Sequence, residues 1–532
     1  MRCHDGSAAD PRVQTHASET APLDDWNFLV NNSANDQATV AGVAVPTGLF
    51  VNGSWRPSTS GNRFEVTDPA TGMPIADVAD ASTEDAFEAL AAAAHAQETW
   101  GRTSPRARAS ILLAAFESVR GRRQEIAAVI TAEMGKTLAD ALGEVDYGAE
   151  FLRWFAEQVA HVHGDYGHAP SGDFRIVTTK VPVGPSLLIT PWNFPLAMGT
   201  RKIGAALAAG CTVILKPASQ TPLTAALLVQ ILAEAGVPDG VVNLIPTTKS
   251  GVLSRELMND SRLRKVSFTG STGVGSTLLH QAADHVLKTS MELGGNGPFL
   301  VLADADVDAA VEGAMVAKFR NGGQSCVAAN RFIVHRSVAE RFTKQLVSRT
   351  AALKVGAGTI QGVGVGPLID AGARDKVHAL VTEALEKGAR AACGGSFIEG
   401  DGYFYAPTVL VNVPAEARVN HEEIFGPVAP ITVVQDDDEA IKQANDTPFG
   451  LAAFVYTRDI SRAFNVAERL EAGMIGINRG LVSEAAAPFG GIKASGLGRE
   501  GGHLGIEEYL ETKFFSLDLR PPTDVGEKVD PT

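Results

Sequence analysis

Residues 212–219 read Thr-Val-Ile-Leu-Lys-Pro-Ala-Ser, a short apolar run with strand character that ends at a lysine before a proline. Similar strand-like runs recur on both sides of it, and helical stretches lie between them. The strand-like runs are 184–190, 212–216, 241–245 and 265–268, and the helical stretches are 198–209, 221–235 and 250–258. Strands separated by single helices predict a right-handed parallel βαβ sheet, which binds its ligands at the carboxyl ends of the strands.

The segments around this sheet predict further elements. Ser82 followed by Asp85 is a capping-box pattern that predicts the start of a helix. We expect short strands between 49 and 78, helices at about 105–133 and 138–161, a β segment over 164–181, and a β-like tail over 508–519 that pairs with it or with a partner subunit. A second α/β alternation follows Glu292, through 299–301, 305–319, 331–334, 338–352, 374–387, 431–434 and 461–470. The chain is therefore expected to be an α/β protein of more than one domain.

Composition excludes several classes of function. The 532 residues include 46 Lys and Arg against 61 Asp and Glu, a formal net charge of −15, which argues against nucleic acid or an anionic membrane as the main partner. The longest apolar run, 203–215, is too short to cross a bilayer, and the N-terminus lacks the apolar core of a signal peptide. The four cysteines form no C-x-x-C pair, so we expect no disulfide framework, no metal site and a cytoplasmic location.

One cysteine has the setting of a nucleophile. It ends the stretch Phe-Arg-Asn-Gly-Gly-Gln-Ser-Cys at 319–326, where a flexible Asn-Gly-Gly segment lets backbone N–H groups face whatever Cys326 attacks. Glu292 precedes Leu-Gly-Gly, and Asn193 stands between two prolines in Pro-Trp-Asn-Phe-Pro. A thiol, a candidate base and an amide donor are the parts of covalent catalysis on a carbonyl.

Two features indicate a nucleotide. Lys216 stands at a strand end, where a lysine can bind ribose or phosphate oxygens, although a solvated lysine is the ordinary alternative. The stretch Phe-Thr-Gly-Ser-Thr-Gly-Val-Gly at 268–275 predicts a strand-to-helix turn whose helix N-terminus can face a pyrophosphate.

Taken together, these motifs closely resemble the aldehyde dehydrogenase superfamily, over about residues 50–519. Further matching stretches are Glu-Glu-Ile-Phe-Gly-Pro at 422–427, Pro-Phe-Gly-Gly-Ile-Lys at 488–493 and Ser-Gly-Leu-Gly-Arg-Glu at 495–500. The resemblance implies a Rossmann-like cofactor domain, an α/β catalytic domain and a small β oligomerisation element. We assign 46–163 and 183–292 to the first, 293–494 to the second, and 164–182 with 495–520 to the third. Residues 1–45 are expected to be a mobile extension and 521–532 a C-terminal tail.

The resemblance also implies a mechanism. Cys326 as thiolate attacks the aldehyde carbon to give a thiohemiacetal, and the Asn193 amide and the Cys326 backbone N–H form the oxyanion hole. Hydride transfer to the nicotinamide leaves a thioester, and Glu292 activates the water that hydrolyses it. The cofactor residues implied by the resemblance are Trp192, Lys216, Ser219, Gly270, Ser271, Glu423 and Phe425.

The residue at 219 bears on the choice of cofactor. NAD-preferring relatives often carry a glutamate there, which repels the 2′-phosphate of NADP, whereas Ser219 removes that charge and can donate to the phosphate. NADP is therefore the preferred cofactor in this interpretation, with NAD possible.

Within the superfamily the chain is most similar to the succinate-semialdehyde dehydrogenases. That similarity places Arg201, Arg320 and Ser483 against the carboxylate of the substrate, a ligand that arginine forks suit well. Alternatively, Arg201 and Lys202 form a surface basic pair, and Arg320 neutralises a buried acid. Succinate and glutarate semialdehydes differ by one methylene, a difference worth only about 1–3 kcal/mol, so the sequence does not separate them.

Two other functions remain open at this point. One is a broad-specificity aldehyde dehydrogenase in which the arginines are structural, and the other is a non-catalytic binding protein on the same fold. The family resemblance further implies a homodimer or homotetramer assembled through the β segments.

Overall fold

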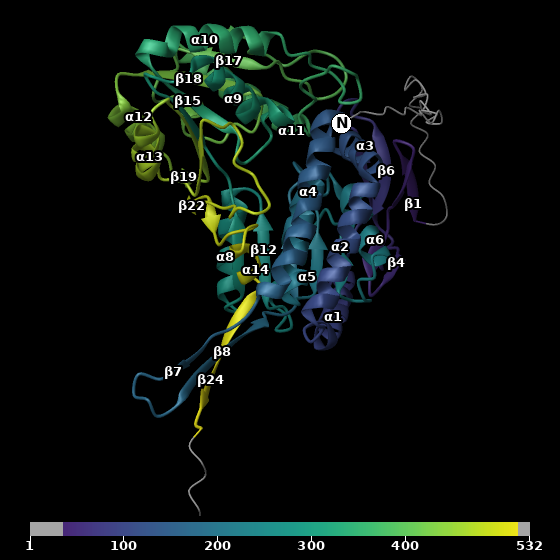
Figure 1. The fold of residues 1–532 in the computed structure, drawn as a ribbon. Helices are drawn as coiled ribbons and strands as arrows, with labels where there is room; N and C mark the ends of the chain where they lie inside the picture. Colours follow the sequence, from purple (N-terminus) through teal and green to yellow (C-terminus); the bar gives the residue numbers. More distant parts are fainter. Residues whose placement is uncertain (1–35, 520–532) are drawn as a thin grey trace, which may run out of the picture.

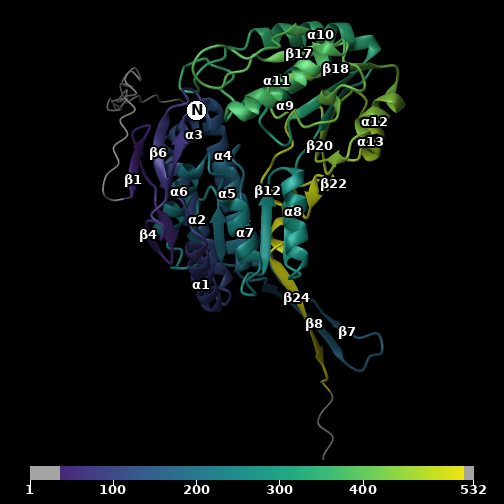
Figure 2. The ribbon, with the colours of Figure 1, turned by 180° about the vertical axis from the view of Figure 1, so that it is seen from behind.

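The computed structural model describes residues 36–519 as two α/β bodies and a slender arm (Figure 1). The first body contains the N-terminal helices and the predicted parallel sheet, and the second body, built mainly from residues after 293, lies against one end of it. The arm projects from the far end of the first body, as the view from behind also shows (Figure 2). The predicted α/β class is confirmed.

The first body is organised around an eight-stranded sheet with the order β23-β13-β12-β9-β10-β11-β3-β4. Its central strands pair in parallel, and β3, β4 and β23 add antiparallel edges. The strands are β3 (Leu49–Val51), β4 (Ser54–Arg56), β9 (Ser186–Ile189), β10 (Val213–Lys216), β11 (Val242–Leu244), β12 (Lys265–Thr269), β13 (Lys288–Glu292) and β23 (Gly496–Leu497). Lys216 and Glu292 therefore both end parallel strands, at the edge where such sheets bind ligands.

Helices cover both faces of this sheet. They are α1 (Thr83–Trp100), α2 (Pro105–Gly121), α3 (Arg123–Met134), α4 (Leu138–Gln158), α5 (Pro195–Ala209), α6 (Pro222–Glu234), α7 (Ser250–Met258) and α8 (Thr272–Ala283), with a short 3-10 turn η1 (Val159–His161) and a four-residue helix α14 (Leu504–Glu507). The predicted capping box is present, since Ser82 and Asp85 satisfy each other's backbone N–H groups at the start of α1. All residues of α5 are buried, because this helix lies between the sheet and α4.

The second body contains a seven-stranded sheet with the order β16-β17-β18-β15-β14-β20-β21. Its strands are β14 (Gly297–Val301), β15 (Ala329–His335), β16 (Arg390–Cys393), β17 (Thr408–Val411), β18 (Val428–Val434), β20 (Ala452–Tyr456) and β21 (Met474–Ile477). The helical elements are α9 (Val307–Phe319), η2 (Arg320–Gly323), α10 (Arg336–Ala351), α11 (Ala371–Glu386), η3 (Arg418–Asn420), α12 (Asp437–Asn445) and α13 (Ile460–Arg469). A small ladder joins β19 (Phe449–Gly450) to β22 (Ile492–Lys493).

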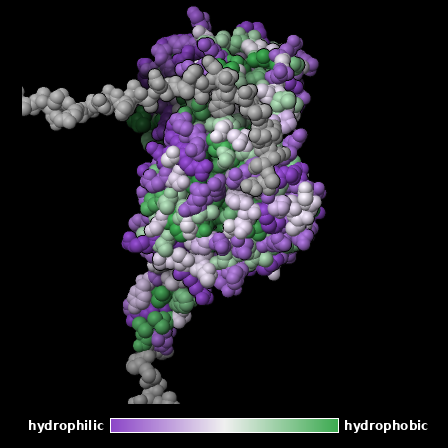
Figure 3. All heavy atoms as spheres, turned by 90° about the vertical axis from the view of Figure 1, so that its right-hand side faces the viewer, coloured by the Kyte–Doolittle hydropathy of each residue, from purple (hydrophilic) through white to green (hydrophobic). Residues whose placement is uncertain are grey.

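The arm is a three-stranded antiparallel sheet of β7 (Tyr166–His168), β8 (Arg175–Pro182) and β24 (Leu510–Leu517). The tail thus pairs with the predicted β segment of its own chain, in a register that runs from Leu510 opposite Pro182 to Leu517 opposite Arg175. Apolar side chains on the arm are open to solvent, including Phe514 at 56% and Phe515 at 47% exposure. Figure 3 shows this apolar surface in green below the body.

The structure differs from the sequence-based expectation in three places. The single helix expected at 105–133 is two helices, because the chain leaves helical geometry at Arg122 (φ −100°, ψ 21°). Residues 1–35 and 520–532 lie outside the described residues, but the end of the expected extension forms a hairpin, β1 (Gln37–Val40) with β2 (Val43–Pro46), in which Val40 and Val45 are buried. The next hairpin, β5 (Arg63–Thr67) with β6 (Pro74–Ala79), lies among the short strands expected between 49 and 78.

The segment 495–509, expected in the oligomerisation element, belongs spatially to the first body. Its strand β23 pairs with β13, so that Gly496 lies opposite Glu292. Gly496 has φ +135°, and a Cβ there would lie 1.9 Å from the Met291 carbonyl oxygen, so only glycine fits at this contact.

Residues 36–519 contain neither a membrane-spanning helix nor a cluster of metal-binding side chains. No helix there has both the length and the apolar character needed to cross a membrane. No cluster of three His, Cys, Asp or Glu side chains there is arranged to hold a metal ion.

Candidate active site

The structure brings Cys326, Asn193, Trp192, Gly270 and Ser271 into one cleft between the two bodies. Two hollows make up this cleft, one of about 240 Å³ that Cys326, Glu423 and Phe425 also line, and one of about 400 Å³ that reaches Lys216 and Ser219. They have in common the residues Pro191, Trp192, Thr269, Gly270 and Ser271. The cleft therefore forms a continuous path from the thiol to the end of β10.

Cys326 follows a loop that only particular residues can form. Asn321, Gly322 and Gly323 all have positive φ, from 54° to 75°, which is tolerated by asparagine and glycine. A Cβ at Gly323 would lie 2.3 Å from the Gly426 carbonyl oxygen, so the loop passes too close to its neighbour for a larger residue. This fixed turn holds the thiol at the cleft wall, where its side chain is partly exposed.

The Asn193 side chain is held beside the loop that carries Cys326. Its Nδ2 donates to the Gln324 carbonyl oxygen at 3.2 Å, which uses one of its two N–H groups. Asn321 Nδ2 in turn donates to the carbonyl oxygens of Asn193 and Gln324, both at 3.0 Å. Within residues 36–519 the Cys326 backbone N–H donates to no oxygen of another residue. One amide N–H and one backbone N–H are therefore free to receive a developing oxyanion.

The surroundings of the thiol favour its neutral form. Burial raises the pKa of Cys326 to about 12, and the positive charge of Arg201 opposes that rise. A base is therefore needed to form the thiolate.

Glu292, at the end of β13, is 2% exposed, and its Oε2 has no hydrogen-bond partner within the described residues. Burial raises its pKa well above the usual value, and the nearby Glu500 carboxylate raises it further. A Cβ at Gly490 would lie 2.8 Å from Glu292 Oε1, so the glycine leaves space beside the carboxylate. A carboxyl group with a raised pKa and an unused oxygen is suited to accept and return a proton.

Glu500 connects the base with two cations of α5. Its carboxylate forms ion pairs with both Arg201 and Lys202, which are each 1% exposed. Although burial acts in the opposite direction, these two cations bring the pKa of Glu500 below its usual value. Sequence reasoning did not single out Glu500 as a site residue, because nothing in its local motif showed that it faces α5. The alternative of a surface basic pair at 201–202 is wrong.

Arg320 begins η2, with its guanidinium carbon 5.1 Å from the centroid of the Phe194 ring. It forms no ion pair or hydrogen bond within residues 36–519, so the alternative that it neutralises a buried acid has no support there. Ser483 is half-buried in the loop that follows β21. The guanidinium of Arg320 is consequently available to an anion.

The larger hollow has the features of a site for a phosphorylated ligand. Burial lowers the pKa of Lys216 to about 8, and no ion pair compensates it within residues 36–519. Ser271 caps α8, so the N-terminus of that helix lies at the cleft. The lining includes Ser219, Gln220 and Gln281 but no Asp or Glu. A buried cation, a helix N-terminus and uncharged polar groups suit a phosphorylated ligand.

Glu423 and Phe425 line the smaller hollow, at the end of the cleft where Cys326 lies. Glu423 accepts the Gly295 backbone N–H at 3.0 Å, and burial raises its pKa to about 7. The Phe425 ring meets Trp192 edge-on, with centroids 5.3 Å apart. The adjacent Lys318 is buried, its Nζ has no partner within residues 36–519, and its pKa falls to about 7.

Comparison with known proteins identifies the family. The model of the aldehyde dehydrogenase family matches residues 55–515. The chain belongs to the aldehyde dehydrogenase family. It is 55% identical to succinate-semialdehyde dehydrogenase of Paenarthrobacter nicotinovorans, over 83% of this chain and 98% of that protein. It is 48% identical to the NADP(+) succinate-semialdehyde dehydrogenase of Escherichia coli K12 and to glutarate-semialdehyde dehydrogenase of Pseudomonas putida, each over 88% of this chain and 97% of the relative.

Solved structures agree with this assignment. A crystal structure of an NADP-dependent Escherichia coli enzyme superposes with a TM-score of 0.88 at 47% identity, over 89% of this chain and 98% of the other. The aldehyde dehydrogenase fold expected from the motifs is thus confirmed, and the chain is an enzyme of this family. The binding-protein alternative is not supported.

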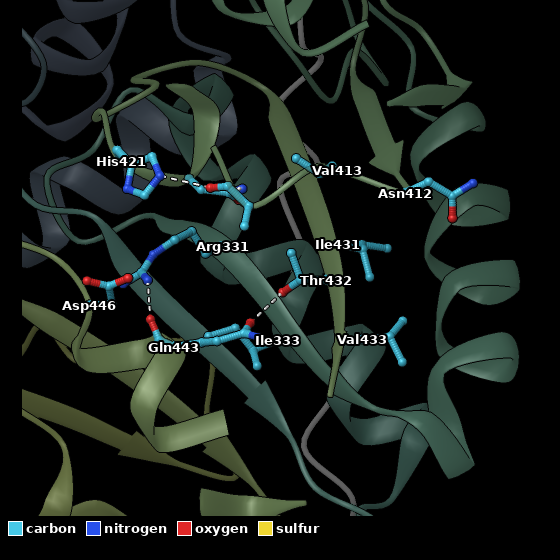
Figure 4. Close-up of a pocket in the computed structure, with 12 residues that line it drawn as sticks. Arg331, Ile333, Asn412, Val413, His421, Ile431, Thr432, Val433, Gln443 and Asp446 are labelled. Atoms are coloured by element: carbon cyan, nitrogen blue, oxygen red, sulfur yellow. Dashed lines mark hydrogen bonds between the residues drawn. The ribbon is translucent and has the colours of Figure 1, made fainter. Parts of the chain in front are cut away.

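A further hollow, of about 330 Å³, opens beside β15 and β18 (Figure 4). Its Arg331 donates to the carbonyl oxygens of Gln443 at 2.6 Å and Ala444 at 2.8 Å, so backbone groups occupy its guanidinium. This hollow is lined by no cysteine and has no residue in common with the cleft at Cys326. We assign it no part in the chemistry.

Proposed function

We propose that this enzyme oxidises succinate semialdehyde, or a close ω-carboxylated semialdehyde, to the dicarboxylic acid with an NAD(P) cofactor. The observation that carries the proposal is the guanidinium of Arg320, which lies over Phe194 without a carboxylate partner in the described residues. Arg201 enters the same region from α5, with its guanidinium carbon 4.1 Å from the Phe489 ring centroid. The chain is also similar to enzymes that are named for succinate semialdehyde and glutarate semialdehyde, which supports the same substrate class.

The first chemical step uses Cys326 as nucleophile. The Glu292 carboxylate takes the thiol proton and passes it to solvent, and Sγ bonds to the aldehyde carbon while the carbonyl electron pair moves to oxygen. The free N–H of Asn193 Nδ2 and the Cys326 backbone N–H stabilise that oxygen. Loss of one such donor typically costs about 2.7–4 kcal/mol in the barrier. A bound nicotinamide supplies the acceptor for the hydride that leaves the same carbon.

Hydrolysis of the thioester then requires Glu292. Its carboxylate takes a proton from water as the water oxygen bonds to the acyl carbon, and the Cys326 sulfur leaves and regains a proton. Burial and Glu500 raise the pKa of Glu292, so the carboxylate is a stronger base than an exposed one. The aldehyde carbon has then become a carboxylate, and release of the dicarboxylate product completes the reaction.

Cofactor recognition is assigned to Trp192, Lys216, Ser219, Gly270, Ser271, Glu423 and Phe425. The absence of acidic residues from the lining near Ser219 supports preference for NADP, because a 2′-phosphate meets no like charge there. The NADP(+) named in the Escherichia coli relative supports the same preference. NAD is expected to be a weaker cofactor.

The chain is proposed to act as a homodimer or homotetramer in the cytoplasm. Exposed Phe514 and Phe515 on the arm favour burial against a second copy, because such apolar surface is costly in water. The three described cysteines are all free, which suits a reducing compartment.

Steady-state kinetics test the proposal. Succinate semialdehyde, glutarate semialdehyde and butanal are compared with NADP and then NAD, by the absorbance of the reduced cofactor. We expect turnover of both semialdehydes, abolished in Cys326→Ala, and a selective rise in KM for them in Arg320→Ala. If butanal is used as efficiently as the semialdehydes, the enzyme has broad specificity and the substrate assignment fails.

A further inference from the structure

Tyr147 lies on α4, where this helix packs against α5, and no sequence motif marks it. Its hydroxyl oxygen is buried and has no hydrogen-bond partner within the described residues. Buried tyrosine hydroxyls usually have a partner, and an unsatisfied one costs about 1–3 kcal/mol. The hydroxyl is thus available to a hydrogen-bond acceptor that comes within its reach.

The ring of Tyr147 is fixed by aromatic and apolar neighbours. It meets the Phe151 ring edge-on, with centroids 5.0 Å apart, and it packs against the cluster of Phe194, Ala197 and Met198. The ring therefore has little freedom to move its hydroxyl towards another partner.

The two arginines of the proposed carboxylate site contact the same cluster. Arg201 Nη2 lies 3.0 Å from Met198 Sδ, and its guanidinium carbon is 5.9 Å from the Phe151 centroid. Arg320 lies over Phe194. Tyr147 thus packs against side chains that Arg201 and Arg320 also contact.

The electrostatic surroundings keep the hydroxyl protonated. Burial raises the pKa of Tyr147, and Arg201 and Arg320 oppose that rise through their charge. Arg201 and Ser483 lie close enough to the Tyr147 hydroxyl to lower its pKa, although neither contact has the geometry of a hydrogen bond. At neutral pH the phenol is a donor, as recognition of an anion requires.

We propose that Tyr147 is a specificity-determining residue, whose hydroxyl donates a hydrogen bond to the carboxylate at the far end of the aldehyde, beside Arg201, Arg320 and Ser483. This inference rests on the proposed function, since it assigns a further donor to the same carboxylate. Arg201 is already paired with Glu500, so only part of its guanidinium can bind the substrate. The Tyr147 hydroxyl takes no part in that ion pair and is an additional donor. Because the phenol is rigid, it also limits where the carboxylate can sit and hence the length of the substrate.

The test is Tyr147→Phe, which removes only the hydroxyl. Succinate semialdehyde and butanal have four-carbon chains and differ in the carboxylate. We expect kcat/KM for succinate semialdehyde to fall by about 10- to 100-fold, mainly through KM, because a hydrogen bond to a charged group is lost. The value for butanal should stay within about twofold, since an uncharged aldehyde does not use this contact.

Tyr456→Phe is the matched control, because Tyr456 is another buried tyrosine, stacked on Phe299 in the second body and absent from the cleft lining. It should leave the ratio of the two substrates unchanged. An equal loss for both substrates in Tyr147→Phe, or a loss explained by a lower melting temperature, would assign Tyr147 to packing alone.

The two proposals fail in different ways. If the wild-type enzyme shows no preference for succinate semialdehyde over butanal, the proposed function is wrong. If the wild type shows that preference and Tyr147→Phe retains it in full, only the role of Tyr147 is overturned.

Discussion

The Lys136 ammonium lies 2.7 Å from the main-chain carbonyl oxygen of Asn193, a residue 57 positions further along the chain. The same Nζ lies 2.6 Å from Glu144, whose other carboxylate oxygen accepts the Leu196 and Ala197 backbone N–H groups at the start of α5. Both charged side chains are fully buried. A buried ion pair therefore fixes the segment from which the Asn193 amide reaches Cys326.

Lys136→Met tests this support. The change leaves Glu144 as an unpaired buried charge and removes a donor to Asn193, so we expect a loss of about 3–5 kcal/mol in the free energy of unfolding. The melting temperature and kcat should both fall. Arg341→Ala is the control, since it removes an exposed pair with Asp308 worth at most about 1 kcal/mol. Equal melting temperatures for Lys136→Met and the wild type would contradict the assignment.

Glu500→Gln tests the origin of the raised pKa of Glu292. Burial raises that pKa most, the Glu500 carboxylate raises it further by repulsion, and Arg201 and Lys202 lower it. Removing the negative charge weakens the repulsion and frees the two cations, so both effects lower the pKa of Glu292. We expect the rise of kcat with pH to move to lower pH, measured with saturating NADP and butanal so that carboxylate binding is not involved.

Glu508→Gln is the control for that pH profile. Glu508 accepts hydrogen bonds from the Ser290 hydroxyl and the Arg499 backbone N–H, and it is not among the groups that shift the pKa of Glu292. It should leave the midpoint in place. If the midpoint of the kcat profile moves to higher pH in Glu500→Gln, the electrostatic explanation is wrong.

Ser219→Glu tests cofactor preference. A carboxylate at this position meets the 2′-phosphate of NADP, whose charge has the same sign, but can accept hydrogen bonds from the ribose of NAD. We expect kcat/KM for NADP to fall by at least about 100-fold, equivalent to roughly 2.7 kcal/mol, while that for NAD is maintained. The same change at Ser337, on α10, is the control. Retention of NADP preference would show that other groups select the phosphate.

Phe514→Asp tests the role of the arm. The charge falls on a side chain that is 56% exposed, so it should leave the protomer folded but destabilise any interface that buries it. We expect a smaller particle by light scattering and sedimentation. Ile460→Asp, at a 64% exposed residue of α13, is the matched control. An unchanged mass for Phe514→Asp would remove the arm from the assembly interface.

Local patterns in the sequence were sufficient for most of the fold. The strand at 213–216 and the capping box at Ser82 depend on near neighbours, so their positions could be predicted with small errors. The break at Arg122 was missed because no proline stands there and Gly121 alone does not end a helix. The hairpin at 37–46 was missed because its strands are only four residues each and follow a long polar segment, with which they were grouped.

The sequence by itself determined the family, the nucleophile loop and the candidate residues, since glycines at forced turns and motifs of fixed spacing are local properties. Only the tertiary structure decided that Glu500 pairs with Arg201 and Lys202, that Arg320 has no such partner among the described residues, and that the Tyr147 hydroxyl is buried beside them. The physical reason is that burial and Coulomb interactions depend on distance in space, and these residues come from α4, α5, η2 and the segment after β23, which are far apart along the chain.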